Sequence, residues 1–381
     1  MTIQKRRLHL EVTGRCNLTC SYCYNSGFNN LASTKTELSF KEQIMLIGQS
    51  IDIGCTSFCF SGGEPFLNPK IIDLIVACPE SSRVSVITNA SLLDDVFINR
   101  LTGLKQLREL KISLDGFYSH NNLRKGSSYE QILRIIWLVM DVNPQCKIIV
   151  NTMINKYSIN ELMMLYECLK TLRVKHWRID MPFNSGRCSE NSADFMDVTF
   201  RKIVFVYREL LVRYLKDFKP LNLEIFNVYK SQINPDGYYL FNDEVHPCAY
   251  YNDTVTVRPN GDLTYCPSLA FPVSNWRETR SLESSLRSAF QHKYFSLTLK
   301  QLSGCGMCRY FKICGGGCRA DAITWADDEL SPDPISCTLM PLIEKYIAPV
   351  LPVAERKMYE KLIDSSKNSP RTVRTAAELL R

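Results

Sequence analysis

The chain has 381 residues, which exceeds the length at which one hydrophobic core usually stops growing, so we expect two domains. Its composition, 45% hydrophobic and 22% charged, is typical of globular proteins, and no apolar run is long enough to cross a membrane. The formal charge of +7 comes from scattered Lys and Arg residues without a recognition motif, so we predict neither nucleic-acid nor membrane partners. The apolar stretch after the basic N-terminus is too short for a signal peptide, and we predict a cytoplasmic protein.

Short apolar runs alternate with amphipathic segments from residue 8 to about residue 180. The predicted strands are residues 8–12, 57–60, 84–88, 109–114, 147–153 and 176–181. The predicted helices between them are residues 39–51, 70–77, 93–101, 129–141 and 160–172. This alternation predicts an α/β fold with a parallel sheet built from βα units.

Three cysteines, Cys16, Cys20 and Cys23, follow the first predicted strand with the spacing C-x3-C-x2-C. Three thiolates on one short loop can hold three irons of a cubane cluster and leave the fourth iron open to another ligand. Tyr22 would shield such a cluster from water. A zinc loop is one alternative, but structural zinc usually takes four ligands from paired knuckles. Three buried structural thiols are the other alternative.

This spacing resembles that of radical S-adenosylmethionine (SAM) enzymes. The resemblance implies a [4Fe-4S] cluster on Cys16, Cys20 and Cys23, whose open iron chelates the amino and carboxylate groups of SAM. It also implies a partial (β/α)6 barrel of the TIM type, with its chemistry at the carboxyl ends of the strands.

Polar residues follow several predicted strands, where the resemblance expects SAM contacts. Adjacent glycines allow a close backbone approach to a ligand, and a neighbouring carboxylate can accept hydrogen bonds from an ammonium group. In the family, the motif that reads Gly62-Gly63-Glu64 here holds the SAM amino group. By position, four further residues resemble contacts to the SAM carboxylate, ribose and adenine, although ordinary polar caps of strand ends are the alternative. These residues are Asn89, Ser113, Asp115 and Asn151.

Two residues after the sixth predicted strand are candidates for other roles. Arg187 could clamp a carboxylate of SAM or of the substrate, and an ordinary surface arginine is the alternative. Cys188 could donate a hydrogen atom to a substrate radical, and a plain loop thiol is the alternative. The remaining cysteines outside the cluster motifs are predicted to be small core residues: Cys55, Cys59, Cys78, Cys146 and Cys168.

The rest of the chain falls into further segments. A long helical segment, 194–216, closes the barrel domain, which we predict to span residues 1–219. Residues 220–245 are interpreted as a connector with a turn at 234–237. Residues 246–340 are predicted to form a small cysteine-rich α+β domain, and residues 341–381 a packing helix with a tail.

The second domain carries its own cysteine pattern: Cys248, Cys266, Cys305, Cys308, Cys314, Cys318 and Cys337. Between the first two, Asn260-Gly261 predicts the turn of a hairpin that pairs residues 254–258 with 262–265. The pattern closely resembles the SPASM domain, which adds two auxiliary Fe–S clusters to radical SAM enzymes. A zinc ribbon, the alternative, would fit paired C-x2-C knuckles better.

The resemblance implies an interleaved order of ligands and three [4Fe-4S] clusters in all. The first auxiliary cluster would be bound by Cys248, Cys266 and Cys318, and the second by Cys305, Cys308, Cys314 and Cys337. Some members carry an eighth cysteine shortly after the first, and residues 250–254 contain none. The first auxiliary cluster would therefore have an open iron or a ligand other than cysteine.

The resemblance implies an enzyme that cleaves SAM reductively to a 5′-deoxyadenosyl radical, which abstracts hydrogen from a substrate C–H bond. SPASM enzymes commonly modify ribosomally made peptides, so our leading prediction is the cross-linking or oxidation of such a peptide. Few residues precede Cys16, so peptide recognition would need a separate leader-binding protein or direct docking. The mildly basic charge suits an acidic electron donor such as flavodoxin or ferredoxin.

Other functions stay open because a fold does not fix a substrate. The first alternative is a dehydrogenase or epimerase of a small molecule: a sugar, aminocyclitol, amino acid or nucleoside. A third possibility, an Fe–S electron carrier, fits less well because a carrier needs no SAM pocket. Sulfatase maturation is disfavoured, because Pro267 follows Cys266 where those enzymes typically place a catalytic aspartate.

Overall fold

The computed structural model describes residues 5–25, 37–191, 198–231, 244, 246–248, 253–269, 271–364 and 366–367. The predicted turn at 234–237 and the end of the predicted tail, 368–381, lie outside these ranges. Two compact units divide the chain. The first comprises Met1–Thr152, Ser185–Arg187 and Ala249–Ser296, and the second comprises Met153–Asn184, Cys188–Cys248 and Leu297–Arg381.

A mostly parallel sheet forms the centre of the first unit. The strand order in this unit is β11-β10-β9-β1-β2-β3-β4-β5. The parallel strands are β9 (Thr254–Val257), β1 (Arg7–Thr13), β2 (Ser57–Gly62), β3 (Arg83–Thr88), β4 (Leu107–Ser113) and β5 (Lys147–Met153). The strands predicted for this part of the chain are confirmed, and so is the α/β fold class with an open, mostly parallel sheet.

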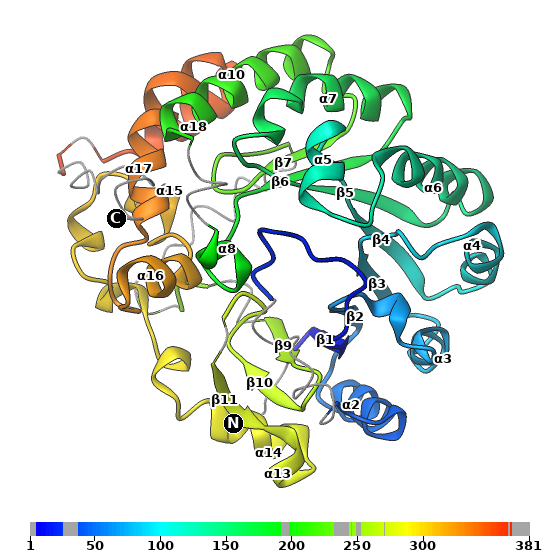
Figure 1. Ribbon diagram of the computed structural model, residues 1–381. Helices are drawn as coiled ribbons and strands as arrows, with labels where there is room; N and C mark the ends of the chain where they lie inside the picture. The colour runs from blue at the N-terminus through cyan, green and yellow to red at the C-terminus, as the bar shows by residue number, and fades with distance from the viewer. Residues whose placement is uncertain are drawn as a thin grey trace. The chain divides into compact units, whose positions relative to one another are not determined.

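Helices cover one face of this sheet (Figure 1). They are α2 (Phe40–Asp52), α3 (Ile71–Val76), α4 (Asp95–Thr102) and α6 (Tyr129–Val142). The strand residues that face them are apolar and inaccessible to solvent, for example Leu10, Phe60 and Val84. The short helix α5 (Tyr118–Leu123) follows the carboxyl end of β4, and its Leu123 carbonyl accepts a hydrogen bond from the Ser21 amide at 3.3 Å. The helix predictions 39–51, 70–77, 93–101 and 129–141 are confirmed, and Ser39 begins α2 with a reciprocal capping box to Glu42.

The opposite face of the sheet is polar. Strand residues alternate between faces, so the positions between the apolar ones point away from the helices. They include His9, Glu11, Ser61, Lys111, Ser113 and Asn151. His9 Nε2 lies 2.5 Å from the hydroxyl of Ser61, and burial, together with Lys111, Arg258 and Arg7, lowers the pKa of His9 to about 3. A face with this many polar groups is suited to a ligand more than to further apolar packing.

The predicted hairpin is present at the edge of the same sheet. β9 pairs antiparallel with β10 (Asp262–Thr264), which continues to β11 (Pro272–Asn275) and the short helices α13 (Trp276–Thr279) and α14 (Leu282–Ala289). Gly261 occupies the turn with φ +91°, a conformation that glycine adopts without a steric penalty. Because β9 also pairs with β1, the hairpin extends the sheet of the N-terminal strands.

The second unit contains a small sheet and a group of helices. β6 (His176–Asp180) pairs parallel with β7 (Asn222–Ile225), which pairs antiparallel with β8 (Tyr229–Lys230). The predicted strand 176–181 and helix 160–172 are confirmed, whereas the segment predicted as a connector contains β7 and β8. The helices are α7 (Leu162–Thr171), α8 (Arg187–Glu190, which begins in the first unit), α10 (Phe200–Lys216), α15 (Phe311–Cys314), α16 (Arg319–Ala326), α17 (Pro334–Leu342) and α18 (Val353–Leu362). Within the described ranges, no helix is both long and apolar enough to span a membrane.

Burial predicts which valines stabilise the first unit. Val84 in β3 is 0% exposed and Val96 in α4 is 71% exposed. Val84→Ala should lower the free energy of unfolding by about 2 kcal/mol, because it removes two buried methyl groups and leaves a cavity. Val96→Ala should change it by less than about 0.5 kcal/mol. Urea titrations that show equal effects for the two variants would contradict this assignment of the core.

Candidate cofactor site

The backbone at the end of β2 touches the loop that follows β1. The amide of Gly63 donates to the carbonyl of Thr13 and the amide of Glu64 to the carbonyl of Arg15, both at 2.8 Å. A Cβ at Gly62 would lie 2.1 Å from the Thr13 oxygen, and one at Gly63 would lie 2.1 Å from the Arg15 oxygen. Both glycines are therefore required by this backbone contact, whether or not a ligand also approaches them.

Glu64 ties the same loop to the end of β3. Its carboxylate accepts hydrogen bonds from the Thr88 hydroxyl at 2.7 Å, the Asn89 amide at 2.8 Å and the Phe66 amide at 3.2 Å. The side chain is 1% exposed, and burial raises its pKa to about 7 against the opposing effect of these bonds and of Arg124. Glu64 is thus a buried brace of the site, and its contact with the SAM amino group stays a prediction.

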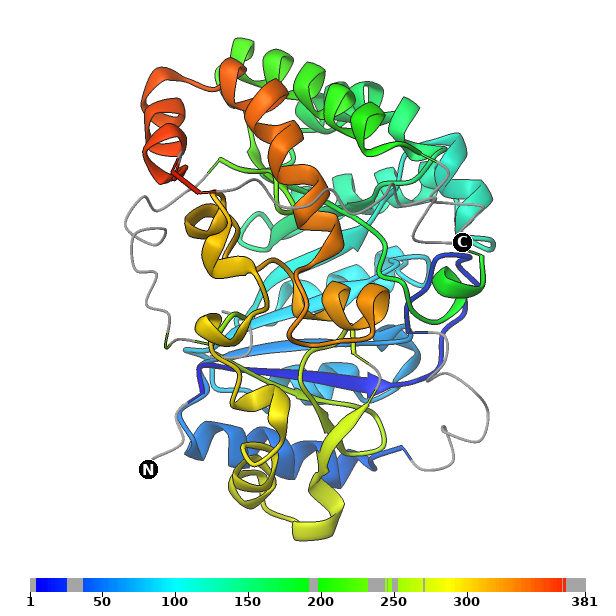
Figure 2. The ribbon, with the colours of Figure 1, turned by 90° about the vertical axis from the view of Figure 1, so that its left-hand side faces the viewer.

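The three-cysteine loop begins at the carboxyl end of β1, the dark blue arrow in Figure 2. The Cys16 sulfur lies 3.5 Å from the Leu18 amide and 4.0 Å from Asn89 Nδ2. Asn89 also donates to the side chain of Asn17 at 3.0 Å, so it anchors the loop on β3. The predicted ligand Cys16 therefore already has two N–H donors directed at its sulfur.

Arg124, which follows α5, provides the equivalent contact to Cys20. Its Nη1 lies 3.9 Å from the Cys20 sulfur, and its guanidinium lies 5.3 Å above the ring of Tyr22. Its Nε donates to Asp115 at 2.7 Å, and the Tyr22 hydroxyl donates to the same carboxylate. Burial alone would raise the pKa of Asp115, but Arg124 holds it below its usual range. Asp115, predicted as a SAM contact, is placed here as a buried support of the cysteine loop.

Arg187 also contacts this loop. Its Nε donates to the backbone carbonyl of Cys20 at 2.8 Å, within the first unit. This contact positions the loop. The predicted binding of a SAM or substrate carboxylate by Arg187 stays a prediction. The next residue, Cys188, belongs to the second unit and is 2% exposed, and its role as a hydrogen donor also stays a prediction.

Ser113 and Asn151 differ from the other predicted SAM contacts. They are paired in register at the ends of β4 and β5, so their side chains lie on the same, polar face. Asn151 Oδ1 is buried without a hydrogen-bond partner among the described residues, and Ser113 lies next to Asn151 in the strand register. A buried amide oxygen without a partner costs free energy. This pair therefore fits a polar ligand such as SAM.

The thiols themselves fit a bound cationic centre. None of the sixteen cysteines, which all lie within the described ranges, forms a disulfide. Burial of its sulfur, together with the nearby Cys20, Glu64 and Cys23, raises the pKa of Cys16 to about 11. Burial also raises the pKa of Cys20, and Arg124 opposes this rise. Thiols with a raised pKa are stabilised as thiolates when metal ions bind them.

The second unit brings another group of predicted ligands together. Cys314 and Cys337 have pKa values raised by burial and by Asp333, and each is raised further by Cys305 and Cys308, so the four thiols are neighbours. The adjacent Gly316 and Gly317 both have positive φ, which allows the tight turn before Cys318. Binding of a cluster by these cysteines stays a prediction.

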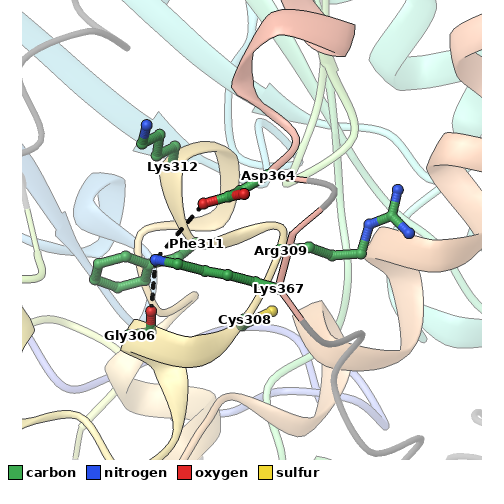
Figure 3. Close-up of a pocket in the computed structure, with 7 residues that line it drawn as sticks. All are labelled: Gly306, Cys308, Arg309, Phe311, Lys312, Asp364 and Lys367. Atoms are coloured by element: carbon green, nitrogen blue, oxygen red, sulfur yellow. Dashed lines mark hydrogen bonds and ion pairs between the residues drawn. The ribbon is translucent and has the colours of Figure 1, made fainter.

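Cys308 also lines a small cavity of about 180 Å³ (Figure 3). Arg309, Lys312 and Lys367 add positive charge to its wall, and Lys367 donates to the carbonyl of Gly306 at 2.9 Å. Asp364 lies 3.8 Å from the same lysine and provides the negative charge of the wall. The predicted auxiliary site thus has a mainly basic border.

The three remaining predicted ligands are divided between the units. Cys266 lies in the first unit, and Cys248 and Cys318 lie in the second, so this set stays a prediction. Across the described ranges, no three His, Cys, Asp or Glu side chains converge closely enough to hold one metal ion. The thiolates of a cubane cluster bind different iron atoms and need not converge in this way.

Sequence reasoning missed two residues of the first unit. Arg124 follows an unremarkable short helix, and only its charge, nine residues after Asp115, could have suggested a partner. Arg258 ends the strand Thr-Val-Thr-Val and is 3% exposed. A charged residue at the end of a buried strand was a usable signal, because buried charges are almost always paired.

Residues 10–169 match the model of the Radical SAM superfamily. An AdoMet-dependent heme synthase of Nitratidesulfovibrio vulgaris is 23% identical over 350 residues, 87% of this chain and 91% of the synthase. A GTP 3′,8-cyclase of Trichormus variabilis is 32% identical over 118 residues, 30% of this chain and 35% of the cyclase. The similar proteins are thus enzymes with different substrates.

Solved structures of similar fold include two that contain peptides. SuiB of Streptococcus suis, bound to the precursor peptide SuiA, superposes with a TM-score of 0.64 at 17% identity and covers 87% of this chain and 74% of SuiB. The structure of anSMEcpe with bound AdoMet and Cp18Cys peptide superposes with a TM-score of 0.67 at 15% identity. The match covers 93% of this chain and 98% of the anSMEcpe chain. At these identities, the likeness shows a shared fold.

The contact between Gly63 and the β1 loop predicts a contrast between two Gly→Ala substitutions. Gly63→Ala should lower the free energy of unfolding by about 3 kcal/mol or more, because the new Cβ would overlap backbone atoms. Gly48 in α2 has open space around it, and Gly48→Ala should raise stability by roughly 0.5–1 kcal/mol. Thermal unfolding of both variants checks this, and a tolerated Gly63→Ala would contradict the described contact.

Glu64 predicts a pH-dependent term in stability. Its pKa in the folded protein, about 7, lies above the ordinary value of 4.5, so its favourable contribution is complete below 4.5 and lost as pH rises through 7. Between pH 5 and 8, the wild type should therefore lose about 2–3 kcal/mol relative to Glu64→Gln. Urea titrations of the iron-free proteins measure this difference. Thr88→Val, which removes one donor to the carboxylate, should move the transition to higher pH, and a difference that is constant with pH would contradict the assignment.

Proposed function

We propose that this chain is a radical SAM enzyme that modifies a ribosomally made peptide and holds a [4Fe-4S] cluster on Cys16, Cys20 and Cys23. The observation that carries the proposal is the donor shell of the cysteine loop. Asn89 and Arg124, from the ends of β3 and α5, direct N–H groups at the sulfurs of Cys16 and Cys20. Hydrogen bonds to the sulfurs are one of the means by which proteins tune Fe–S clusters.

When bound together, the cluster and SAM supply the 5′-deoxyadenosyl radical that removes hydrogen from a C–H bond. The chain itself positions these groups and restricts water. Arg187 holds the backbone of Cys20, and the buried Asp115 keeps Arg124 and Tyr22 in place beside the loop. Glu64 fixes the loop relative to β3 through Thr88 and Asn89.

The buried Asn151 Oδ1, which has no hydrogen-bond partner among the described residues, supports a SAM pocket at the ends of β4 and β5, where Ser113 is paired with it in the register. We assign Ser113 and Asn151 hydrogen bonds to the polar atoms of SAM, because an unpartnered amide oxygen can accept a hydrogen bond and a hydroxyl can donate or accept one. Gly62 and Gly63 let the motif pass close to the β1 loop, and their backbone would face the SAM amino group. Asn89 and Asp115 act indirectly, through the cysteine loop.

The C-terminal cysteines are proposed to hold two auxiliary [4Fe-4S] clusters in the arrangement of a SPASM domain. The grouping of Cys305, Cys308, Cys314 and Cys337 supports the second of these. The basic border beside Cys308, formed by Arg309, Lys312 and Lys367, favours an acidic electron donor such as a flavodoxin or ferredoxin. A separate leader-binding protein is a further expected partner.

Two observations bear on the substrate. The similar folds of SuiB and anSMEcpe, both solved with peptides, favour a peptide. The sequence similarity to a heme synthase along 87% of this chain favours the second candidate, a dehydrogenase or epimerase acting on a small molecule. The barrel would serve either substrate class, since the polar face of the sheet carries no feature unique to a peptide.

Substitution of a cluster cysteine tests the radical SAM assignment. After anaerobic reconstitution with iron and sulfide, the wild type should convert SAM to 5′-deoxyadenosine in the presence of dithionite, and Cys20→Ala should reduce this to the level without protein. Cys78→Ala is the matched control, because Cys78 is also buried in the first unit but lies outside the loop. Equal activity of the two variants would refute the site.

The same assay identifies the substrate class. Host extract is supplied as a peptide fraction and a fraction of small metabolites, and 5′-deoxyadenosine is quantified with each. Stimulation by the peptide fraction, with mass shifts in its components, supports peptide modification. Stimulation by the small metabolites alone would replace it with the second candidate.

A further inference from the structure

The buried guanidinium of Arg258 donates to four acceptors of the first unit. Its Nη1 donates to Glu11 Oε1 at 2.7 Å and to Asn25 Oδ1 at 2.9 Å. Its Nη2 donates to the backbone carbonyls of Pro267 at 2.7 Å and Leu269 at 2.8 Å. These distances are those of well-formed, charge-assisted hydrogen bonds.

The acceptors belong to three segments that the sequence keeps far apart. Glu11 lies on β1, Asn25 follows Cys23 by two residues, and Pro267 directly follows Cys266. The pairing of β9 with β1 brings Arg258 beside Glu11, because Leu10 and Val257 are partners in the register. One side chain therefore connects the loop of Cys16, Cys20 and Cys23 to the loop of Cys266.

The Asn25 side chain extends this connection to the end of β2. Its Oδ1 accepts from Arg258, and its Nδ2 donates to the carbonyl of Gly62 at 3.4 Å.

The arrangement uses properties that only arginine has. Glu11 balances the buried charge of Arg258. The side chain of Glu11 is 2% exposed and that of Arg258 is 4% exposed. A guanidinium carries five donors in a planar fork, whereas the ammonium of lysine is a compact charge with three donors. Lysine could keep the ion pair with Glu11, but it could not reach four acceptors in this geometry.

We propose that Arg258 is a positioning residue that fixes the Cys16–Cys23 loop relative to the Cys266 loop, and thereby the ligands of two different cluster sites. The brace is a property of the chain itself, and its meaning for clusters rests on the proposed function. Loss of the fork should loosen both loops together, and the environment of a cluster on the first loop should change with them.

Amide hydrogen exchange tests the brace without any cofactor. In Arg258→Lys, peptides that cover residues 14–25 and 263–269 should both exchange about tenfold faster than in the wild type. Local opening of either loop would no longer have to break the hydrogen bonds of the guanidinium. The control is Arg134→Lys: Arg134 is another arginine of the first unit, and it joins α6 to α4 by donating to the Asp95 carboxylate at 2.7 and 2.9 Å. It should leave these peptides unchanged.

A second variant covers the case in which Arg258→Lys does not fold. Asn25→Ala removes one acceptor and should speed exchange in 14–25 more than in 263–269. Faster exchange in neither loop, or equal effects in the Arg134→Lys control, would overturn the proposal.

Electron paramagnetic resonance of the reconstituted, dithionite-reduced protein tests the consequence for a cluster. The signal that responds to SAM should change its g-values in Arg258→Lys at unchanged iron content, and it should not change in Arg134→Lys. An unaltered signal in Arg258→Lys would overturn the part of the proposal that concerns clusters. A wild type that binds no iron and cleaves no SAM would instead refute the proposed function, while hydrogen exchange would still decide on the brace.

Discussion

The candidate site depends on a backbone contact that has no room for side chains. The carbonyls of Thr13 and Arg15, at the end of β1, accept hydrogen bonds from Gly63 and Glu64, at the end of β2. The register of β1 and β2 shifts between Glu11 and Thr13, so the two chains come together just before the cysteine loop begins. A loop held by its backbone keeps its side chains free for ligands, which is what a set of metal-binding cysteines requires.

Buried charges surround this loop, and each is compensated locally. Arg124 is paired with Asp115, and Arg258 with Glu11. A buried ion pair is a poor source of stability, because the cost of removing both charges from water offsets much of their attraction. Each pair therefore serves mainly to orient its arginine. The carboxylate holds the guanidinium so that its remaining N–H groups reach the cysteine loop or its neighbours.

The sequence predicted the fold well because the alternation of strands and helices is a local, periodic signal. It did not predict β7 and β8, which are short and lie within a segment without clear alternation. It also could not assign the partners of Arg124 and Arg258, since these contacts join residues up to 247 positions apart. The cysteines were recognisable from spacing alone, whereas the side chains that surround them become visible only when the strands are placed side by side.

Hydrogen bonding distinguishes two groups of polar residues at the strand ends, which the sequence motifs alone do not distinguish. Glu64, Asn89 and Asp115 occupy strand ends and are polar, yet their side chains are engaged with the backbone, the cysteine loop or Arg124. Asn151 occupies an equivalent position, paired with Ser113, and its buried Oδ1 has no hydrogen-bond partner in the described part of the chain. A folded protein rarely leaves a buried polar atom without a partner, so we expect a ligand beside Asn151, whereas the partnered side chains hold the site in shape.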